Sequence, residues 1–227
     1  MIQSATTSFY LTYVLLLTTG TITFIESLRT PIAAVRHIMN LETCISVIAA
    51  FFYGRFVKMI EDSPATVPPD YAAINRMRYT DWFITTPLML LVICLVFAYN
   101  NGTSVRAGTY GIVLALNVVM LLSGYFGDRR GAVAEPRGPL TRKQGLAVGF
   151  AAYFALFGVI WYSLVRGSRG ADNYAIFALF SGLWALYGVV YMLDEERKNL
   201  LYNVLDAMAK CFVGIFLWAY FTRVLVI

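Results

Sequence analysis

The sequence predicts an all-α membrane protein, built as one bundle of seven transmembrane helices over residues 1–227. The composition is 59% hydrophobic and 14% charged, with a mean hydropathy of +0.66, which is far too apolar for an average soluble domain. Seven runs of about 20 mainly apolar residues are each long enough to cross a bilayer. The connections between them are short, so no separate soluble domain is expected. The predicted spans are roughly 8–28, 38–59, 79–99, 106–126, 143–165, 174–193 and 199–222.

The segments around these spans carry simple local signals. No basic segment precedes "FYLTYVLLLTTG", so the first span is expected to be a retained helix rather than a cleaved signal peptide. The second span ends in "EDSPATVPPDY" (61–71), a connection stiffened by its prolines. Residues 127–141, rich in Gly, Pro and Arg, separate the fourth span from the fifth. Neither connection resembles a catalytic loop, and no enzymatic activity is predicted.

The seventh span carries two charges in an apolar setting. "NVLDAMAKCFVGIFLWAYF" (203–221) contains Asp206 and Lys210, which lie one turn apart on the same face of a helix. A charge near the bilayer centre costs at least about 2.5–3.5 kcal/mol, so such residues usually face the interior of a bundle and mark a function. The alternative is an internal ion pair that only holds helices together.

The third span carries a matching set. In "RYTDWFITTPLMLLV" (78–92), which is expected to open the third helix, four residues fall close to one face at 100° per residue. These residues are Arg78, Asp81, Thr85 and Val92. Pro87 lacks a backbone N–H group, and the hydroxyls of Thr85 and Thr86 are expected to help satisfy the carbonyl groups that it frees. For this helix alone, a kinked helix with a structural ion pair remains the alternative.

Other types of site are disfavoured. Cys44, Cys94 and Cys211 all fall inside predicted spans and form no CxxC pair, so this odd, buried set argues against disulfides and metal binding. His37 is the single histidine. No metal site is predicted. The net charge of +5 is mostly offset by local acidic residues, so a nucleic-acid partner is not supported.

The motifs "RYTDWFITTP" in the third span and "LDAMAK" in the seventh resemble those of the microbial rhodopsins, which are retinal-binding seven-helix membrane proteins. Other spans support the resemblance through "AAFFY", "GTYGIVLALNVVM" and "WALYGVVY". The chain departs from the family at Gly188, where many members have proline, and at Tyr191, where many have tryptophan. The first span and most of the fifth match only in hydropathy.

The resemblance implies a role for each charged residue. Lys210 would carry all-trans retinal as a Schiff base, a buried cation that needs nearby anions. Asp81 and Asp206 would be those anions, and Asp81 would also accept the proton. Arg78 would balance their charge from the extracellular side, and Thr85 lies on the same face as Asp81.

The resemblance also implies a set of residues around the chromophore. Tyr53 and Tyr187 would hydrogen-bond Asp206 and hold it ionised. Met89 lies where a glutamine would favour blue absorption, so green absorption is favoured. For Trp82 and Trp184 the alternative is ordinary core packing. The residues expected to bind retinal, besides Lys210, are Tyr53, Trp82, Thr86, Met89, Asn117, Met120, Trp184, Tyr187 and Tyr191.

A proton pump also needs a donor on the cytoplasmic side, and here the chain departs from the outward pumps. They carry Asp or Glu at the position of Val92, and valine cannot donate a proton. Glu42, eleven residues before Tyr53, would lie at the level of Val92 on a neighbouring helix. Desolvation would keep this carboxyl group protonated, as a donor requires. The alternatives are a glutamate in the headgroup zone and one bonded to a neighbouring protomer.

The set Glu26, Arg36 and Glu42 most resembles the rhodopsins of giant algal viruses. The resulting prediction is an outward pump with protons as the transported ion. The alternatives are a light-gated cation channel, and a photosensor that acts through a membrane partner. Asp81 disfavours a chloride pump, and Thr85 with Val92 disfavours a sodium pump. Lys198 stands where archaeal pumps have an acid, so Glu195 or Glu196 would have to release the proton.

Orientation and assembly also follow from the resemblance. The N-terminus would be extracellular and the C-terminus cytoplasmic. With the N-terminus outside, residues 127–143 also lie outside and carry five basic residues. The positive-inside rule therefore favours the opposite topology. In the lipid bilayer, the protein is expected to form a symmetric homo-oligomer, with a pentamer favoured over a trimer.

Overall fold

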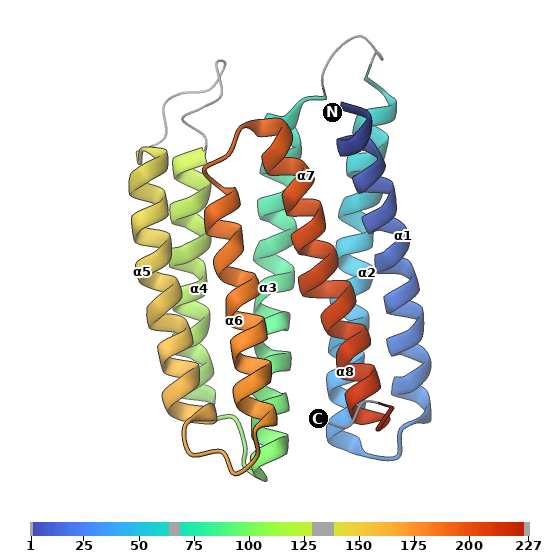
Figure 1. The fold of residues 1–227 in the computed structure, drawn as a ribbon, viewed down its shortest axis with the longest axis vertical. Coiled ribbons are helices and arrows are strands. Elements are labelled where there is room, and N and C mark those ends of the chain that lie inside the picture. The colour runs from blue at the N-terminus through green and yellow to red at the C-terminus, as the bar shows by residue number, and fades with distance from the viewer. Residues whose placement is uncertain (1, 64–68, 129–138, 225–227) are drawn as a thin grey trace.

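The computed structural model describes residues 2–63, 69–128 and 139–224. Within these ranges seven helices are long and apolar enough to cross a membrane, which confirms the predicted fold class (Figure 1). The helical segments are α1 (Ile2–Arg29), α2 (Ala33–Glu61), α3 (Tyr71–Asn101), α4 (Ala107–Asp128), α5 (Arg142–Ile160), α6 (Asp172–Val190), α7 (Glu195–Asp206) and α8 (Val213–Phe221). A π-helical segment, Trp161–Val165, extends α5, and a second one, Ala207–Phe212, joins α7 to α8 into one span. Much of the two proline- and arginine-rich connections, 64–68 and 129–138, lies outside the described residues.

The helix ends differ most from prediction at α3. This helix begins at Tyr71, not at Arg78, because the side chain of Asp70 accepts a hydrogen bond from the backbone N–H of Ala73 and caps the first turn. The polar first turns hid this start from a search for apolar runs. Arg78 therefore lies two turns inside the helix. Similar side-chain caps start α5 at Thr141 and α7 at Asp194.

The two spans that carry the charged motifs are the most enclosed. In their most apolar stretches, 61% of residues are buried in α3 and in the α7–α8 span, against 28–44% in the other five spans. Figure 1 shows α3 and α7 in the middle of the bundle, with α1 and α2 on one side and α4 and α5 on the other. These two spans can therefore hold charges away from lipid.

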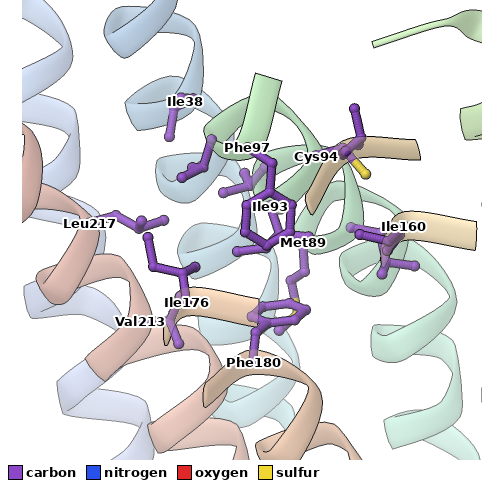
Figure 2. Packing of buried hydrophobic residues seen from close by; sticks show 14 of the residues in the cluster. Ile38, Met89, Ile93, Cys94, Phe97, Ile160, Ile176, Phe180, Val213 and Leu217 are labelled. Atoms are coloured by element: carbon purple, nitrogen blue, oxygen red, sulfur yellow. The ribbon is translucent and has the colours of Figure 1, made fainter. Parts of the chain in front are cut away.

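The two ends of the bundle are named here by the chain. The N-side carries the start of α1 and the α6–α7 connection, and the C-side carries the start of α2 and the end of α8 (Figure 1). A large apolar cluster fills the C-side half between α2, α3, α6 and α8. Figure 2 shows part of it, including Ile38, Ile93, Phe97, Val213 and Leu217. Val92 is 1% exposed in the same cluster.

The expectation for the threonines beside Pro87 was wrong. Pro87 leaves the carbonyl group of Phe83 without its N–H donor. The hydroxyls of Thr85 and Thr86 do not replace this donor, because they donate to the carbonyl groups of Asp81 and Trp82 at 2.9 and 2.7 Å. The reason is geometric: each threonine reaches the carbonyl four residues before itself.

The cysteines are not all buried. Cys94 and Cys211 are buried, whereas Cys44 lies on the exposed face of α2, and all three are free. In a membrane helix that face contacts lipid, where a small apolar thiol costs little. The described residues contain no group of His, Cys, Asp and Glu that could hold a metal ion.

Candidate functional site

The centre of the bundle holds a lysine between two carboxylates. Lys210 Nζ lies 2.7 Å from Asp81 Oδ2 and 3.7 Å from Asp206 Oδ1, and all three side chains are at most 1% exposed. Asp81 comes from α3, while Asp206 and Lys210 lie one turn apart in the seventh span, as the spacing predicted. The salt bridge from Arg78 Nη1 to Asp206 Oδ2, at 3.2 Å, adds a second cation. Two buried cations thus face two buried anions, which is the condition for holding charge in a medium of low polarity.

The two carboxylates are held very differently. Asp206 accepts hydrogen bonds from Tyr53 and Tyr187, both at 2.8 Å, and from the Trp82 indole at 3.2 Å, besides its contact with Arg78. Several donors stabilise the charged form of a carboxyl group. Asp81 has only Lys210, and its Oδ1 atom has no hydrogen-bond partner among the described residues. Of the two acids, Asp81 therefore loses less support when it takes up a proton.

Arg78 connects this centre to the N-side. Its Nη1 donates to Tyr53 Oη at 2.9 Å, and its Nη2 donates to the Oδ1 atoms of Asn203 and Asn199 at 2.7 and 3.3 Å. The guanidinium carbon also lies 5.1–5.7 Å from the centres of four aromatic rings, which favours a cation through the ring quadrupole. These rings belong to Phe9, Tyr53, Phe56 and Tyr202.

A second charged cluster closes the N-side. Lys198, fully buried, bonds Asp128 and Glu195 at 2.8 Å each, and Arg142 bonds the same two acids at 3.1 and 2.9 Å. Asn75 donates to the other oxygen of Glu195 at 2.7 Å. The sequence analysis missed Asp128 and Arg142, because their partners lie 14–70 residues away and no local pattern connects them.

The two candidate release acids differ in this cluster. Glu195 is held by three donors, which favour its carboxylate form. Glu196 has a buried Oε1 atom without a hydrogen-bond partner among the described residues.

An apolar cavity begins at Lys210 and runs between α3, α4, α5 and α6. The space free of protein atoms in and around this cavity, including the part that is open to the outside, is about 780 Å³. Eight of the ten residues predicted to bind retinal line it: Trp82, Thr86, Met89, Met120, Trp184, Tyr187, Tyr191 and Lys210. Two do not. Tyr53 contacts Asp206 instead, and Asn117 lies one layer further out, where its Nδ2 donates to Thr86 Oγ1 at 2.9 Å.

Thr85 is fully buried but also lies off the cavity. Its hydroxyl bonds the backbone of Asp81 rather than the carboxylate.

Glycines shape the cavity wall in a way that the sequence analysis missed. Gly124, Gly145, Gly149 and Gly188 all line the cavity. A Cβ atom at position 188 would lie 2.6 Å from the ring of Phe150, so glycine replaces the proline of many family members where this ring packs. The sequence signal was glycine at position 188, where many family members have proline. Phe150, which packs against it, lies in the fifth span, where the resemblance to the family extended only to hydropathy.

Glu42 lies on the other side of Lys210, toward the C-side. Its side chain is 3% exposed, and a Cβ atom at Gly214 of α8 would lie 3.0 Å from its Oε2 atom. Within the described residues this carboxyl group has no ion-pair partner, and the Cys211 thiol is near enough to interact with it. Glu26 is half-buried near the end of α1, and Arg36 is exposed at the start of α2, where it donates to the carbonyl of Thr30 at 3.2 Å.

The chain matches the family described as "Bacteriorhodopsin-like protein" over residues 4–224. It belongs to this family. Members bind retinal through a Schiff-base lysine, and the apolar cavity that ends at Lys210 fits such a group.

Known relatives agree with this assignment. The crystal structure of the viral rhodopsin OLPVRII is 43% identical in sequence, covers 98% of this chain and 99% of its own, and has a TM-score of 0.87. The light-driven proton pump from Leptosphaeria maculans is 20% identical, covers 97% and 96%, and has a TM-score of 0.73, which shows the shared fold. Among the curated relatives, Opsin-1 of Neurospora crassa is 31% identical over 62% of this chain, and Archaerhodopsin-2 of Halobacterium sp. is 27% identical over 73%. These matches cover 47% and 63% of the two relatives.

The N-side cluster predicts a stability effect. Lys198→Gln should lower the free energy of unfolding by about 1–3 kcal/mol, because it removes two charge-assisted hydrogen bonds made by a fully buried ammonium group. Thermal unfolding in detergent, followed by circular dichroism, measures this. Arg197→Gln is the control: its pair with Asp194 is 66% and 57% exposed, so the loss should stay within about 0–1 kcal/mol. Equal midpoints for the two variants would contradict the role given to Lys198.

Proposed function

We propose that this protein is a light-driven outward proton pump in which Lys210 carries retinal. The observation that carries the proposal is the 2.7 Å contact between Lys210 Nζ and Asp81 Oδ2 inside a fully buried site. Retinal would supply light absorption and a change of shape that redirects the nitrogen to which it is bound. The chain supplies the groups that hold and move the proton at that nitrogen.

The different support of the two acids assigns their roles. Asp81 is the acceptor, because it touches Lys210 and has an oxygen free to take a proton. Asp206 stays ionised, because two tyrosines, a tryptophan and Arg78 stabilise its charge. On the N-side, Glu196 is the better release candidate, since three donors hold Glu195 as a carboxylate.

Glu42 is the donor on the opposite side. It is buried and has no ion-pair partner within the described residues, and desolvation disfavours the charged form of a carboxyl group. The apolar cluster in Figure 2 separates the central site from the C-side along α3. This cluster also opposes a continuous ion pathway there, which favours the pump over a cation channel.

Outward transport requires an extracellular N-side and a cytoplasmic C-side. We also propose that the protein assembles as a ring, with five subunits rather than three. Arg36 is exposed and Glu26 is half-buried at the short α1–α2 turn, where neighbouring subunits could pair. Mass photometry in native-like bilayers would count the subunits, and a monodisperse monomer would exclude the ring.

Removing Lys210 tests the attachment site. Lys210→Ala, expressed with retinal, should lack a visible absorption band, because no other lysine lines the cavity within the described residues. Arg78→Gln keeps the lysine and should retain a band. A band like that of the wild type in Lys210→Ala would show that retinal is held elsewhere.

Removing Asp81 tests the acceptor. Asp81→Asn leaves the charge on Lys210 with one anion fewer, so the visible maximum should shift and light-driven acidification should cease. Spectra and pH recordings on cells expressing the variant measure both effects. Undiminished acidification would assign the acceptor to another group.

Replacing Glu42 tests the donor. In Glu42→Gln, proton uptake after a flash should slow by roughly 10²-fold or more, and the remaining rate should depend on the pH of the medium. The colour should not change, because Glu42 does not line the cavity. Glu61→Gln, at the exposed N-side end of the same helix, is the matched control.

The same variant separates pump from channel. Photocurrents that reverse near the Nernst potential of a cation, with altered selectivity in Glu42→Gln, would replace the pump by a channel. Uptake in Glu42→Gln at the wild-type rate at every pH would remove Glu42 as donor.

A further inference from the structure

Three helices meet around the carboxyl group of Glu42. A Cβ atom at Gly214 of α8 would lie 2.9 Å from Thr19 Cγ2 of α1 and 3.0 Å from Glu42 Oε2 of α2. Such distances require something to move, so glycine at 214 leaves the space that the other two side chains occupy. The Glu42 carboxyl group therefore lies against α8 and next to Thr19.

This position is close to the attachment lysine along the chain. Gly214 follows Lys210 by four residues, about one helical turn or roughly 6 Å. A separate contact shows that Thr19 lies at about the depth of Lys210 in the bundle. The Thr12 hydroxyl donates to the carbonyl of Asn203 at 3.2 Å, and seven residues further along each helix come Thr19 and Lys210. Thr19 therefore lies between Lys210 and the Glu42 carboxyl group along the bundle axis.

Two buried hydroxyls in this region are poorly satisfied. Thr19 Oγ1 and Ser46 Oγ belong to fully buried residues, and neither meets the geometry of a hydrogen bond within the described part of the chain. The Cys211 thiol, a weak hydrogen-bonding group, is the polar neighbour of Thr19. Most other intramembrane threonines donate to the carbonyl four residues earlier, as Thr18, Thr21, Thr23, Thr43, Thr85 and Thr86 do. A buried hydroxyl left unpaired costs about 1–3 kcal/mol, so such groups usually bind internal water.

Ser46 extends the polar set toward the site. It lies one turn beyond Glu42 on the same face of α2, roughly 6 Å nearer to Tyr53, which bonds Asp206. It also faces α1, since a Cβ atom at Gly20 would lie 3.3 Å from Ser46 Cβ. Ser46 therefore lies at the α1–α2 contact, and Thr19 lies where α1 meets Cys211 and Gly214 of the seventh span.

Among the described residues, the part of α3 from Asp81 to its end carries no buried hydroxyl without a hydrogen-bond partner. The packing between α2 and α3 includes apolar side chains such as Ile38 and Ile93 (Figure 2), and Val92 belongs to the same cluster. A proton cannot cross a dry apolar layer without hydrogen-bonding groups or water to carry it.

We propose that Thr19 and Ser46 bind internal water and form the proton relay between Glu42 and Lys210, within the α1–α2–α8 interface. The relay rests on the proposed role of Glu42 as donor. One proton leaves the Glu42 carboxyl group, each hydroxyl or water accepts one proton and passes on another, and the lysine nitrogen receives one. Glu42 remains as a carboxylate and takes its proton back from the C-side solution. Gly214 is the positioning residue that keeps the carboxyl group at the start of the relay.

The test uses the full chain with retinal in bilayer nanodiscs, with proton uptake after a flash followed by a pH-indicator dye. Thr19→Val and Ser46→Ala should each slow uptake about tenfold, and more together, with an unchanged visible maximum. Thr19→Ser should restore the rate, because it keeps the hydroxyl. Thr18→Val is the control: Thr18 is exposed and bonds the carbonyl of Val14, so its loss should change nothing.

Gly214→Ala should also slow uptake, because the new methyl group displaces the carboxyl group. Gly182→Ala, where a Cβ atom meets open space, should not. An infrared readout separates a relay from a packing defect. The C=O stretch of protonated Glu42, identified by its loss in Glu42→Gln, should shift in Thr19→Val and stay in place in Thr18→Val.

The outcomes distinguish the two proposals. Slow uptake in Glu42→Gln together with wild-type rates in Thr19→Val, Ser46→Ala and their double variant would overturn the relay and leave the donor intact. Wild-type rates in Glu42→Gln and in all the hydroxyl variants would overturn both. Slow uptake in Thr19→Val that Thr19→Ser fails to restore would assign Thr19 a packing role and overturn its part in the relay.

Discussion

The positive charge of Lys210 in the middle of a membrane bundle is the constraint on which the rest of this structure depends. A buried cation needs anions within contact distance, and Asp81 and Asp206 provide them from α3 and from the lysine's own helix. Asp206 is in turn held by Arg78, two tyrosines and a tryptophan. The same demand explains why α3 and the α7–α8 span are the most enclosed parts of the bundle.

The two sides of this charge centre are built differently, and the difference suits one-way transport. The N-side is a continuous set of polar contacts from Asp206 through Arg78 and Asn199 to Glu195 and Lys198. The C-side, within the described residues, combines the apolar cluster of Figure 2 with a buried acid that has no ion pair and two buried hydroxyls that are poorly satisfied. Charge leaving the centre therefore meets a connected set of polar partners on the N-side. The opposite side has to conduct through a few specific groups.

Hydropathy predicted the fold class and the seven spans, and helical spacing placed Asp206 one turn from Lys210, because both are local properties. The contact of Asp81 with Lys210 was expected only from the resemblance to the microbial rhodopsins. The sequence analysis misplaced the start of α3, where a capping aspartate and polar turns continue the helix beyond its apolar part. It missed the Lys198 cluster, the contact of Gly188 with Phe150 and the packing of the Glu42 carboxyl group against Gly214. Each of these depends on which faces of distant helices meet, and no spacing within one segment carries that information.

The most direct test of the central claim is the pH of an unbuffered suspension of cells that express the protein with retinal. Illumination should acidify the medium, and a protonophore should abolish the change, because the proton gradient is then short-circuited. The absence of any light-induced pH change in cells that show the visible band, or a light-induced alkalinisation, would contradict the account.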